Sequence, residues 1–88
     1  MLDDLRAKFR TRFLETARQR LVRVRSPQAD SGVMASELHS LAGEASILEY
    51  DDCAELAKSA ERHARAGEAR KCRDVIDALA KAVDAIDA

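Results

Sequence analysis

The sequence predicts an all-α fold, an antiparallel up-down-up-down bundle of four helices that spans residues 1–88 as one domain. Apolar residues recur at three- and four-residue steps through four segments, which is the pattern of helices with one buried face. The connections between these segments are short, so neighbouring helices must run antiparallel. Alanine dominates the apolar 47% of the chain, and there are two Phe, one Tyr and no Trp, a composition that suits helices better than sheets.

The first helix is predicted to start at Leu2 and to end at Ser26-Pro27, because proline disfavours the helical conformation in the residue before it. A second helix begins near Asp30 or Ser31, since either side chain can cap its N-terminus. Its apolar positions follow the steps 4, 3, 4 and 3: Met34, Leu38, Leu41, Ala45 and Leu48.

Residues 49–51 are predicted to connect the second helix to the third, and Asp52 with Glu55 resembles a capping box for that third helix. Gly67 is well placed just past its end, where a left-handed conformation is common. The fourth helix then starts at about Glu68. Its inward positions are Cys72, Val75, Ile76, Leu79, Val83 and Ile86.

The overall charge gives no reason to expect binding to nucleic acid or to an anionic membrane, because the formal net charge is only -1. No apolar run approaches the roughly 18 residues needed to span a bilayer. The chain also starts with Asp3 and Asp4 where a signal peptide would be basic. Cys53 and Cys72 fall on apolar stripes, so we interpret them as buried free thiols and expect a soluble, cytoplasmic protein.

The charge is nevertheless uneven along the chain, because residues 6–25 contain eight basic residues and a single acid, Glu15. Charge runs on helices usually form solvated faces, and this is the interpretation we favour. A docking surface is the alternative.

The candidate functional residue is His39. On a helical projection it lies about 140° from the apolar stripe of the second helix and faces solvent. Gly43, one turn later, lowers helix propensity by about 1 kcal/mol relative to alanine, so its small size must meet another requirement. The other neighbours of His39 in this projection are also uncharged: Gly32, Ala35, Ser36, Ala42, Ser46 and, more distantly, Tyr50.

A solvent-facing histidine in such a cleared surface suits nucleophilic phosphoryl transfer. Histidine ordinarily titrates near pH ~6.5, so a neutral ring nitrogen is available to attack phosphorus at physiological pH. The resulting phosphoramidate is labile enough to pass the group onward. The alternative is a surface histidine without a function.

The run from Leu38 to Leu48, LHSLAGEASIL, resembles the phosphorylation helix of histidine phosphotransfer (HPt) domains, whose motif is His-x-Leu-(Lys or Ala)-Gly. The resemblance implies that His39 accepts the phosphoryl group and that Gly43 leaves room for the partner. It also implies a carrier that exchanges phosphate with response-regulator receiver domains and sensor histidine kinases and is not itself an enzyme. Magnesium would be supplied by the receiver domain, so no cofactor or metal is expected in this chain.

Many members of this family have a lysine three residues after the histidine, where this chain has Ala42. Counting equal distances from the connection near Tyr50 places Lys58 and Arg62 at the level of His39, as candidate charge compensation. The same counting across Pro27 places Phe13 and Leu14 there, as candidate docking residues, with core packing as the alternative for Phe13. Two further departures from the family pattern are Glu44, in place of a small hydroxyl residue, and Glu49, in place of a frequent glycine.

Three other interpretations remain open. The first is a non-catalytic helical adaptor that binds a signalling partner. The second is a metal site, which the spacing disfavours because no two of its ligands lie two to four residues apart: His39, Cys53, His63 and Cys72. The third, an autonomous enzyme, lacks a glycine-rich phosphate loop or a nucleophile with a recognisable base. We expect a monomer, with dimerisation through an exposed edge of the bundle as the alternative.

Overall fold

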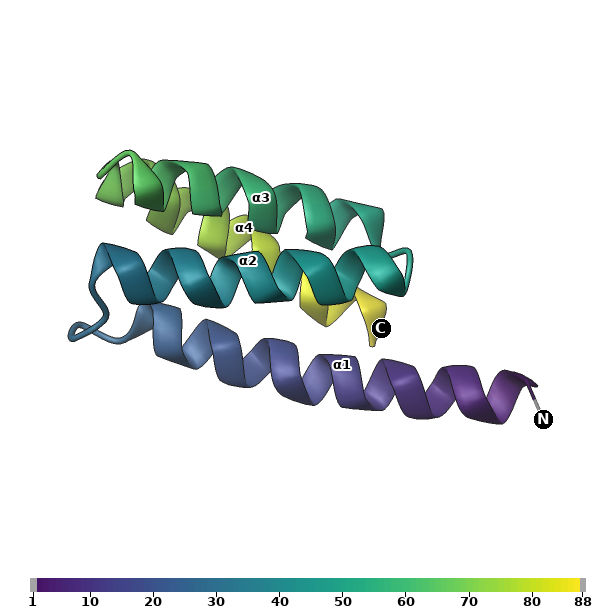
Figure 1. Cartoon of the computed structure of the whole chain (residues 1–88). Coiled ribbons are helices and arrows are strands. Elements are labelled where there is room, and N and C mark those ends of the chain that lie inside the picture. Colours follow the sequence, from purple (N-terminus) through teal and green to yellow (C-terminus); the bar gives the residue numbers. More distant parts are fainter. Residues whose placement is uncertain (1, 88) are drawn as a thin grey trace.

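The computed structural model describes residues 2–87 and contains four helices, α1 (Leu2–Arg25), α2 (Ser31–Ile47), α3 (Asp51–Arg65) and α4 (Ala69–Ile86). Consecutive helices run antiparallel (Figure 1), which confirms the predicted bundle. The packed pairs are α1 with α2, α2 with α3, α3 with α4, and α4 with α1. Helix α1 therefore lies diagonally across the bundle from α3.

The core pairs large residues from three helices with small residues from α3. The buried residues of α3 are alanines and one cysteine: Cys53, Ala54, Ala57, Ala60 and Ala64. The largest fully buried side chains come from α2 and α4: Leu38, Leu41, Cys72, Ile76, Leu79 and Val83. Small residues opposite large ones allow α3 to approach its neighbours closely. Both cysteines are buried and free, as predicted.

The N-terminal caps agree with the sequence at α2 but not at α3. Asp30 caps α2, and its carboxylate accepts a hydrogen bond of 2.8 Å from the backbone N–H of Val33. At α3 the capping residue is Tyr50, whose side chain makes no capping bond, so the predicted capping box of Asp52 and Glu55 is wrong. Asp52 lies instead in the first turn of α3, where its negative charge favours the helix dipole.

The α3–α4 turn has its left-handed residue at Gly67, with φ at 73°. The backbone N–H of Glu68 donates to the carbonyl of His63, and that of Gly67 donates to the carbonyl of Ala64. These two bonds form a Schellman motif, in which glycine is favoured because it has no Cβ. The predicted end of the third helix at Gly67 is thus confirmed.

The α2–α3 turn has the same motif but places Glu49, with φ at 62°, at the left-handed position. Tyr50 N–H donates to the carbonyl of Ala45, and Glu49 N–H donates to that of Ser46. A left-handed conformation costs a residue with a Cβ roughly 1–2 kcal/mol, so Glu49 holds the turn at the expense of local strain.

We predict that Glu49→Gly stabilises the protein by about 1 kcal/mol, because glycine removes this strain. The measurement is urea denaturation of both proteins followed by circular dichroism. Gly67→Ala is the matched control and should destabilise by a similar amount, because it introduces a Cβ at the equivalent position. A loss of stability in Glu49→Gly would contradict this explanation.

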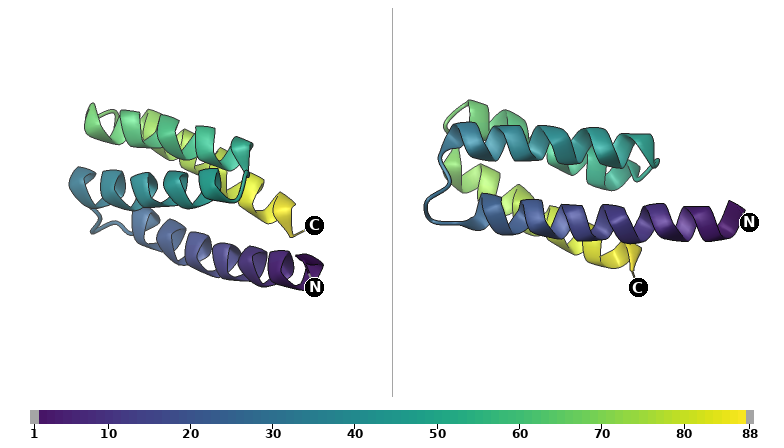
Figure 2. Two further views of the ribbon diagram at one scale, coloured as in Figure 1. Left: turned by 45° about the vertical axis from the view of Figure 1, so that its right-hand side comes forward. Right: turned by 60° about the horizontal axis from the view of Figure 1, so that its bottom comes forward.

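Helix α1 is the longest of the four, with 24 residues against 15 in α3. The ring of Phe13 lies against that of Tyr50, with 5.0 Å between centroids, and Arg6, Phe9 and Arg10 also lie beside residues 47–50, so only the first turns of α1 extend beyond the α2–α3 turn. The right-hand view of Figure 2 shows these first turns of α1 projecting past the ends of the other helices. Among the described residues, no helix is both long and apolar enough to cross a membrane.

Candidate functional site

His39 lies in the middle of α2, and 74% of its side chain is exposed to solvent. The exposure follows from the apolar stripe, because the adjacent Leu38 and nearby Leu41 are fully buried and turn the ring outward. Its Nδ1 atom lies 3.2 Å from Oε1 of Glu61 on α3. The exposed ring is therefore held by a carboxylate from the neighbouring helix.

The carboxylate of Glu61 is itself fixed, because Arg65 one turn later donates to its other oxygen from Nε at 2.8 Å. Only 14% of the Glu61 side chain is exposed. This partial burial disfavours the charged form, but the hydrogen bonds from Arg65 and His39 outweigh it, and the pKa of Glu61 is lowered. Glu61 is therefore ionised at neutral pH and acts as a hydrogen-bond acceptor toward His39.

The cleared surface around His39 is smaller than predicted. Ser36, Gly43 and Ser46 are exposed, and a Cβ added at Gly43 would meet no atom within 4 Å. Ala35 and Ala42 are buried, so their assignment to the exposed patch was wrong. They lie at the edge of the predicted sector, and both join the core beneath that surface.

The two acidic residues of α2 are both engaged by arginines of α1. Arg20 donates from Nε to Glu44 at 2.9 Å and from a second nitrogen to Glu37 at 3.4 Å. Arg23 donates to Glu37 at 2.9 Å. The carboxylate of Glu44 is thus neutralised by Arg20 on the α1 side of the helix.

The positive charges predicted near His39 lie on α3, but neither makes a hydrogen bond to the ring. Lys58 is 3.7 Å from Glu55, and Arg62 is exposed. The counting that selected them found the correct level on α3, because the residue that contacts His39 is Glu61, immediately before Arg62. Glu61 and Arg65 were missed, although their i, i+4 spacing and opposite charges were visible in the sequence.

Phe13 and Leu14 do not lie beside His39. Both are buried in the core, which was the alternative stated for Phe13, and the contact of Phe13 with Tyr50 places it near the C-terminal end of α2. The part of α1 at the level of His39 is near Arg20, because Arg20 bonds Glu37 and Glu44, which precede and follow His39 on α2. Neither Phe13 nor Leu14 therefore offers exposed surface for docking.

The four residues of the metal-site alternative are not brought together. His39 contacts Glu61, whereas Nδ1 of His63 lies 3.0 Å from Glu68 and the thiol of Cys72 donates to the carbonyl of Ala60. Within residues 2–87 there is no group of three or more histidine, cysteine or acidic side chains able to hold a metal ion. The structure therefore gives the metal alternative no support.

Comparison with known proteins supplies a family for this arrangement. The model of the Hpt domain matches residues 2–88, which is essentially the whole chain. The comparisons with curated proteins and with solved structures gave no match. Hpt domains are helical bundles that carry phosphoryl groups in two-component phosphorelays, where they interact with receiver domains and histidine kinases. Because the match extends over all four helices, this chain belongs to the Hpt domain family.

Proposed function

We propose that His39 accepts and donates a phosphoryl group between receiver-domain aspartates, a sensor histidine kinase, or both. The chain would act as a carrier rather than as an autonomous enzyme. The observation that carries the proposal is the exposed His39 ring bound through Nδ1 to an ionised carboxylate. Ser36, Gly43 and Ser46 leave the surrounding surface open to a partner, while Ala35 and Ala42 support it from within.

The contact with Glu61 supports Nε2 of His39 as the attacking atom. Because an ionised carboxylate only accepts hydrogen bonds, Nδ1 carries the ring proton and Nε2 keeps the lone pair. Nε2 attacks the phosphorus of an aspartyl phosphate, the N–P bond forms, and the P–O bond to the aspartate breaks, which releases a carboxylate. The ring becomes positively charged during this step, and the carboxylate of Glu61 stabilises that charge.

Positive charge near the phosphoryl group would come from α3. Arg65 is one candidate because it already bonds Glu61, and Lys58 and Arg62 are exposed along the same helix. The proposal places the Mg²⁺ ion on the receiver domain and no metal on this chain. We further propose that the protein acts in the cytoplasm, where buried free thiols such as those of Cys53 and Cys72 stay reduced.

The direct test is phosphoryl transfer from a receiver domain. A purified receiver domain is charged with radiolabelled acetyl phosphate in the presence of Mg²⁺ and is then incubated with this protein. We expect acid-labile, alkali-stable label on the chain, which is the behaviour of a phosphoramidate. Absence of label with several charged receiver domains, together with binding to one of them, would favour the non-catalytic adaptor.

The role of Glu61 gives a prediction of its own. In Glu61→Gln a neutral amide replaces the carboxylate, so the ring loses its preference for a proton on Nδ1 and its charge stabilisation. We expect the transfer rate to fall about tenfold, which corresponds to about 1.4 kcal/mol in the barrier. Nitrogen-15 NMR of the imidazole should show the Nδ1–H tautomer in the wild type and an increased share of Nε2–H in the variant.

The free energy of unfolding at acidic pH provides an independent test of the contact between Glu61 and His39. Since the pKa of Glu61 is lowered on folding, its contribution to stability is present above the ordinary glutamate value of 4.5 and is lost as the pH falls through the lowered pKa. The difference in unfolding free energy between wild type and Glu61→Gln should therefore shrink under acidic conditions. A difference that grows as the pH falls would contradict this assignment.

A further inference from the structure

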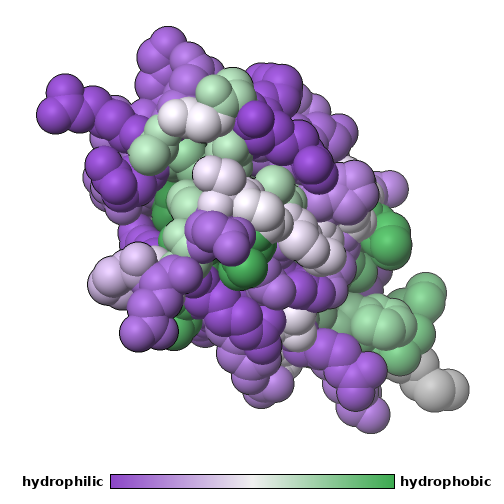
Figure 3. Space-filling view, turned by 60° about the vertical axis from the view of Figure 1, so that its left-hand side comes forward, coloured by the Kyte–Doolittle hydropathy of each residue, from purple (hydrophilic) through white to green (hydrophobic). Residues whose placement is uncertain are grey.

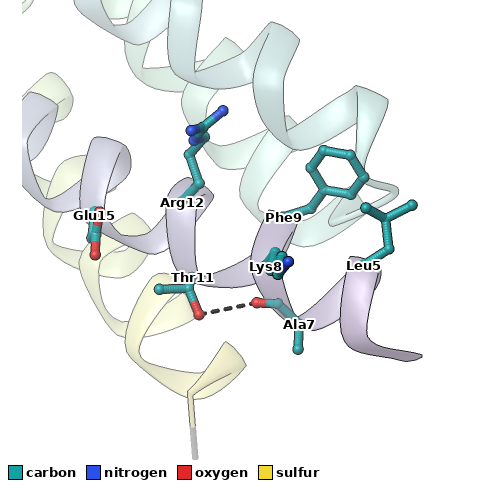
Figure 4. A pocket seen from close by; sticks show the side chains of 7 residues that line it. All are labelled: Leu5, Ala7, Lys8, Phe9, Thr11, Arg12 and Glu15. Atoms are coloured by element: carbon teal, nitrogen blue, oxygen red, sulfur yellow. Dashed lines mark hydrogen bonds between the residues drawn. The ribbon is translucent and has the colours of Figure 1, made fainter. Parts of the chain in front are cut away.

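The start of α1, residues 2–12, forms a projection whose apolar side chains its own chain covers only in part, since Phe9 lies next to Leu48 and Tyr50. Leu2 is 71%, Leu5 49% and Phe9 46% exposed. Figure 3 shows hydrophobic side chains at the lower right, by the start of α1, and a separate patch of hydrophobic and neutral side chains near the centre of the same face. Figure 4 shows a shallow pocket on the surface of α1, and every residue that lines it belongs to α1. Leu5, Phe9 and Arg12 point to the same side of the helix there.

The basic stretch of α1 divides into two halves that differ in their ion pairs. In the half that packs on the bundle, every arginine forms an ion pair with a carboxylate of α2, of α4 or of Asp87, which follows α4. These arginines are Arg18, Arg20, Arg23 and Arg25. In the projecting half, Arg6, Lys8, Arg10 and Arg12 form no ion pair within residues 2–87. The projection is thus an apolar stripe flanked by positive charge that its own chain does not neutralise.

The complementary surface lies at the same end of the bundle, between the start of α3 and the end of α4. It is a hollow of about 470 Å³. Its apolar and small residues are Tyr50, Cys53, Ala82, Ala85 and Ile86. Its charged residues are all acidic, Glu49, Asp51 and Asp52, and no ion pair involves any of them in the described part of the chain.

In its own chain the projection reaches only the edge of this hollow, where Arg6, Phe9 and Arg10 lie near Glu49 and Tyr50, and no residue of α1 lines the hollow itself. Helices α1 and α3 are diagonal in the bundle, and α1 continues straight past the bundle end (Figure 1). A second copy that faces the first end to end can provide the missing partner. Around a two-fold axis, the projection of each copy meets the hollow of the other, so the contact forms twice.

We propose that the chain forms a two-fold homodimer in which residues 2–12 of each copy occupy the α3–α4 hollow of the other. Leu5 and Phe9 supply the apolar anchors for the hollow. Lys8, Arg10 and Arg12 face the acidic rim formed by Glu49, Asp51 and Asp52. This proposal is independent of phosphotransfer, because the surfaces that meet do not include His39.

The test uses charge reversal and the mass of the whole chain in solution. Sedimentation equilibrium should give twice the 9.7 kDa chain mass for the wild type, with weaker association at high ionic strength. Lys8→Glu/Arg12→Glu and Glu49→Lys/Asp52→Lys should each be monomeric, because each places like charges at both contacts. An equimolar mixture of the two variants should form a heterodimer, because both of its contacts again join opposite charges.

The matched control is Arg70→Glu/Arg73→Glu, which reverses two exposed charges on the first turns of α4, at the opposite end of that helix from the hollow. This variant should remain dimeric. A monomeric wild type at near-millimolar concentration would overturn the proposal, and so would a dimer that survives either reversal. Failure of the two variants to associate when mixed, while each remains folded by circular dichroism, would overturn it as well.

Discussion

Replacing His39 by glutamine is expected to abolish phosphoryl transfer. Glutamine can keep a hydrogen bond to Glu61, but its amide nitrogen has no lone pair able to attack phosphorus. We expect the rate of label transfer from a charged receiver domain to fall by more than about 1,000-fold, or about 4 kcal/mol in the barrier. Because the side chain is 74% exposed, the free energy of unfolding should change by less than about 0.5 kcal/mol.

The other histidine provides the matched control. His63 also lies on a helix and also contacts a glutamate, Glu68, through Nδ1. Its side chain is less exposed, however, and it stands in the last turn of α3 beside the turn to α4. His63→Gln should therefore transfer phosphate at the wild-type rate. Acid-labile label that persists in His39→Gln, or disappears in His63→Gln, would show that the accepting residue has been misassigned.

Gly43→Arg is expected to give the second largest loss of transfer. Gly43 lies one turn after His39 on the exposed face, and a Cβ built there meets only open space. A long charged side chain at this position would occupy the volume through which a receiver domain reaches the ring. We expect the transfer rate to fall about 100-fold, equivalent to about 2.7 kcal/mol, while the fold is retained.

Two variants separate this steric effect from other consequences of the mutation. Gly43→Ala should keep transfer near the wild-type rate and raise stability by up to about 1 kcal/mol, because alanine is the better helix former and fits without a clash. Ala78→Arg adds the same side chain at an exposed position of α4, the helix diagonal to α2, and should leave transfer unchanged. Unimpaired transfer in Gly43→Arg would contradict the steric explanation.

The fold was predictable because its information is local. Each helix shows its buried face in the spacing of its apolar residues, and Asp30, Pro27 and Gly67 mark where helices start or end. The capping box at α3 was predicted wrongly because Asp51 and Asp52 are adjacent, and an aspartate suits the first turn of a helix as well as its cap. The strained Glu49 could be suspected only from the family preference for glycine, because the sequence does not give its φ angle.

The site was only partly predictable because it depends on how two helices face each other. A projection of α2 alone places His39 outside correctly, but it does not show that the side carrying Ala35 and Ala42 is buried in the bundle. Counting equal numbers of residues from the α2–α3 turn gave the correct height along α3, but it did not give the direction in which each side chain points. Adjacent residues of a helix point about 100° apart, so Glu61 contacts His39 and Arg62 does not. Across residues 26–30 the same counting gave the wrong height on α1, because this longer connection does not fix the position of α1 along α2.

The ion pairs between α1 and α2 have a consequence for signalling fidelity. Because α2 has no lysine or arginine and both of its acids are bound by Arg20 and Arg23, the helix that bears His39 offers a partner no unpaired lysine, arginine or carboxylate to recognise. Few charged groups must be dehydrated if a receiver domain docks there, so the charges of α2 would distinguish little between one receiver domain and another. Discrimination between cognate and foreign regulators would then fall to α3, and sequence change there could rewire the relay without altering the chemistry at His39.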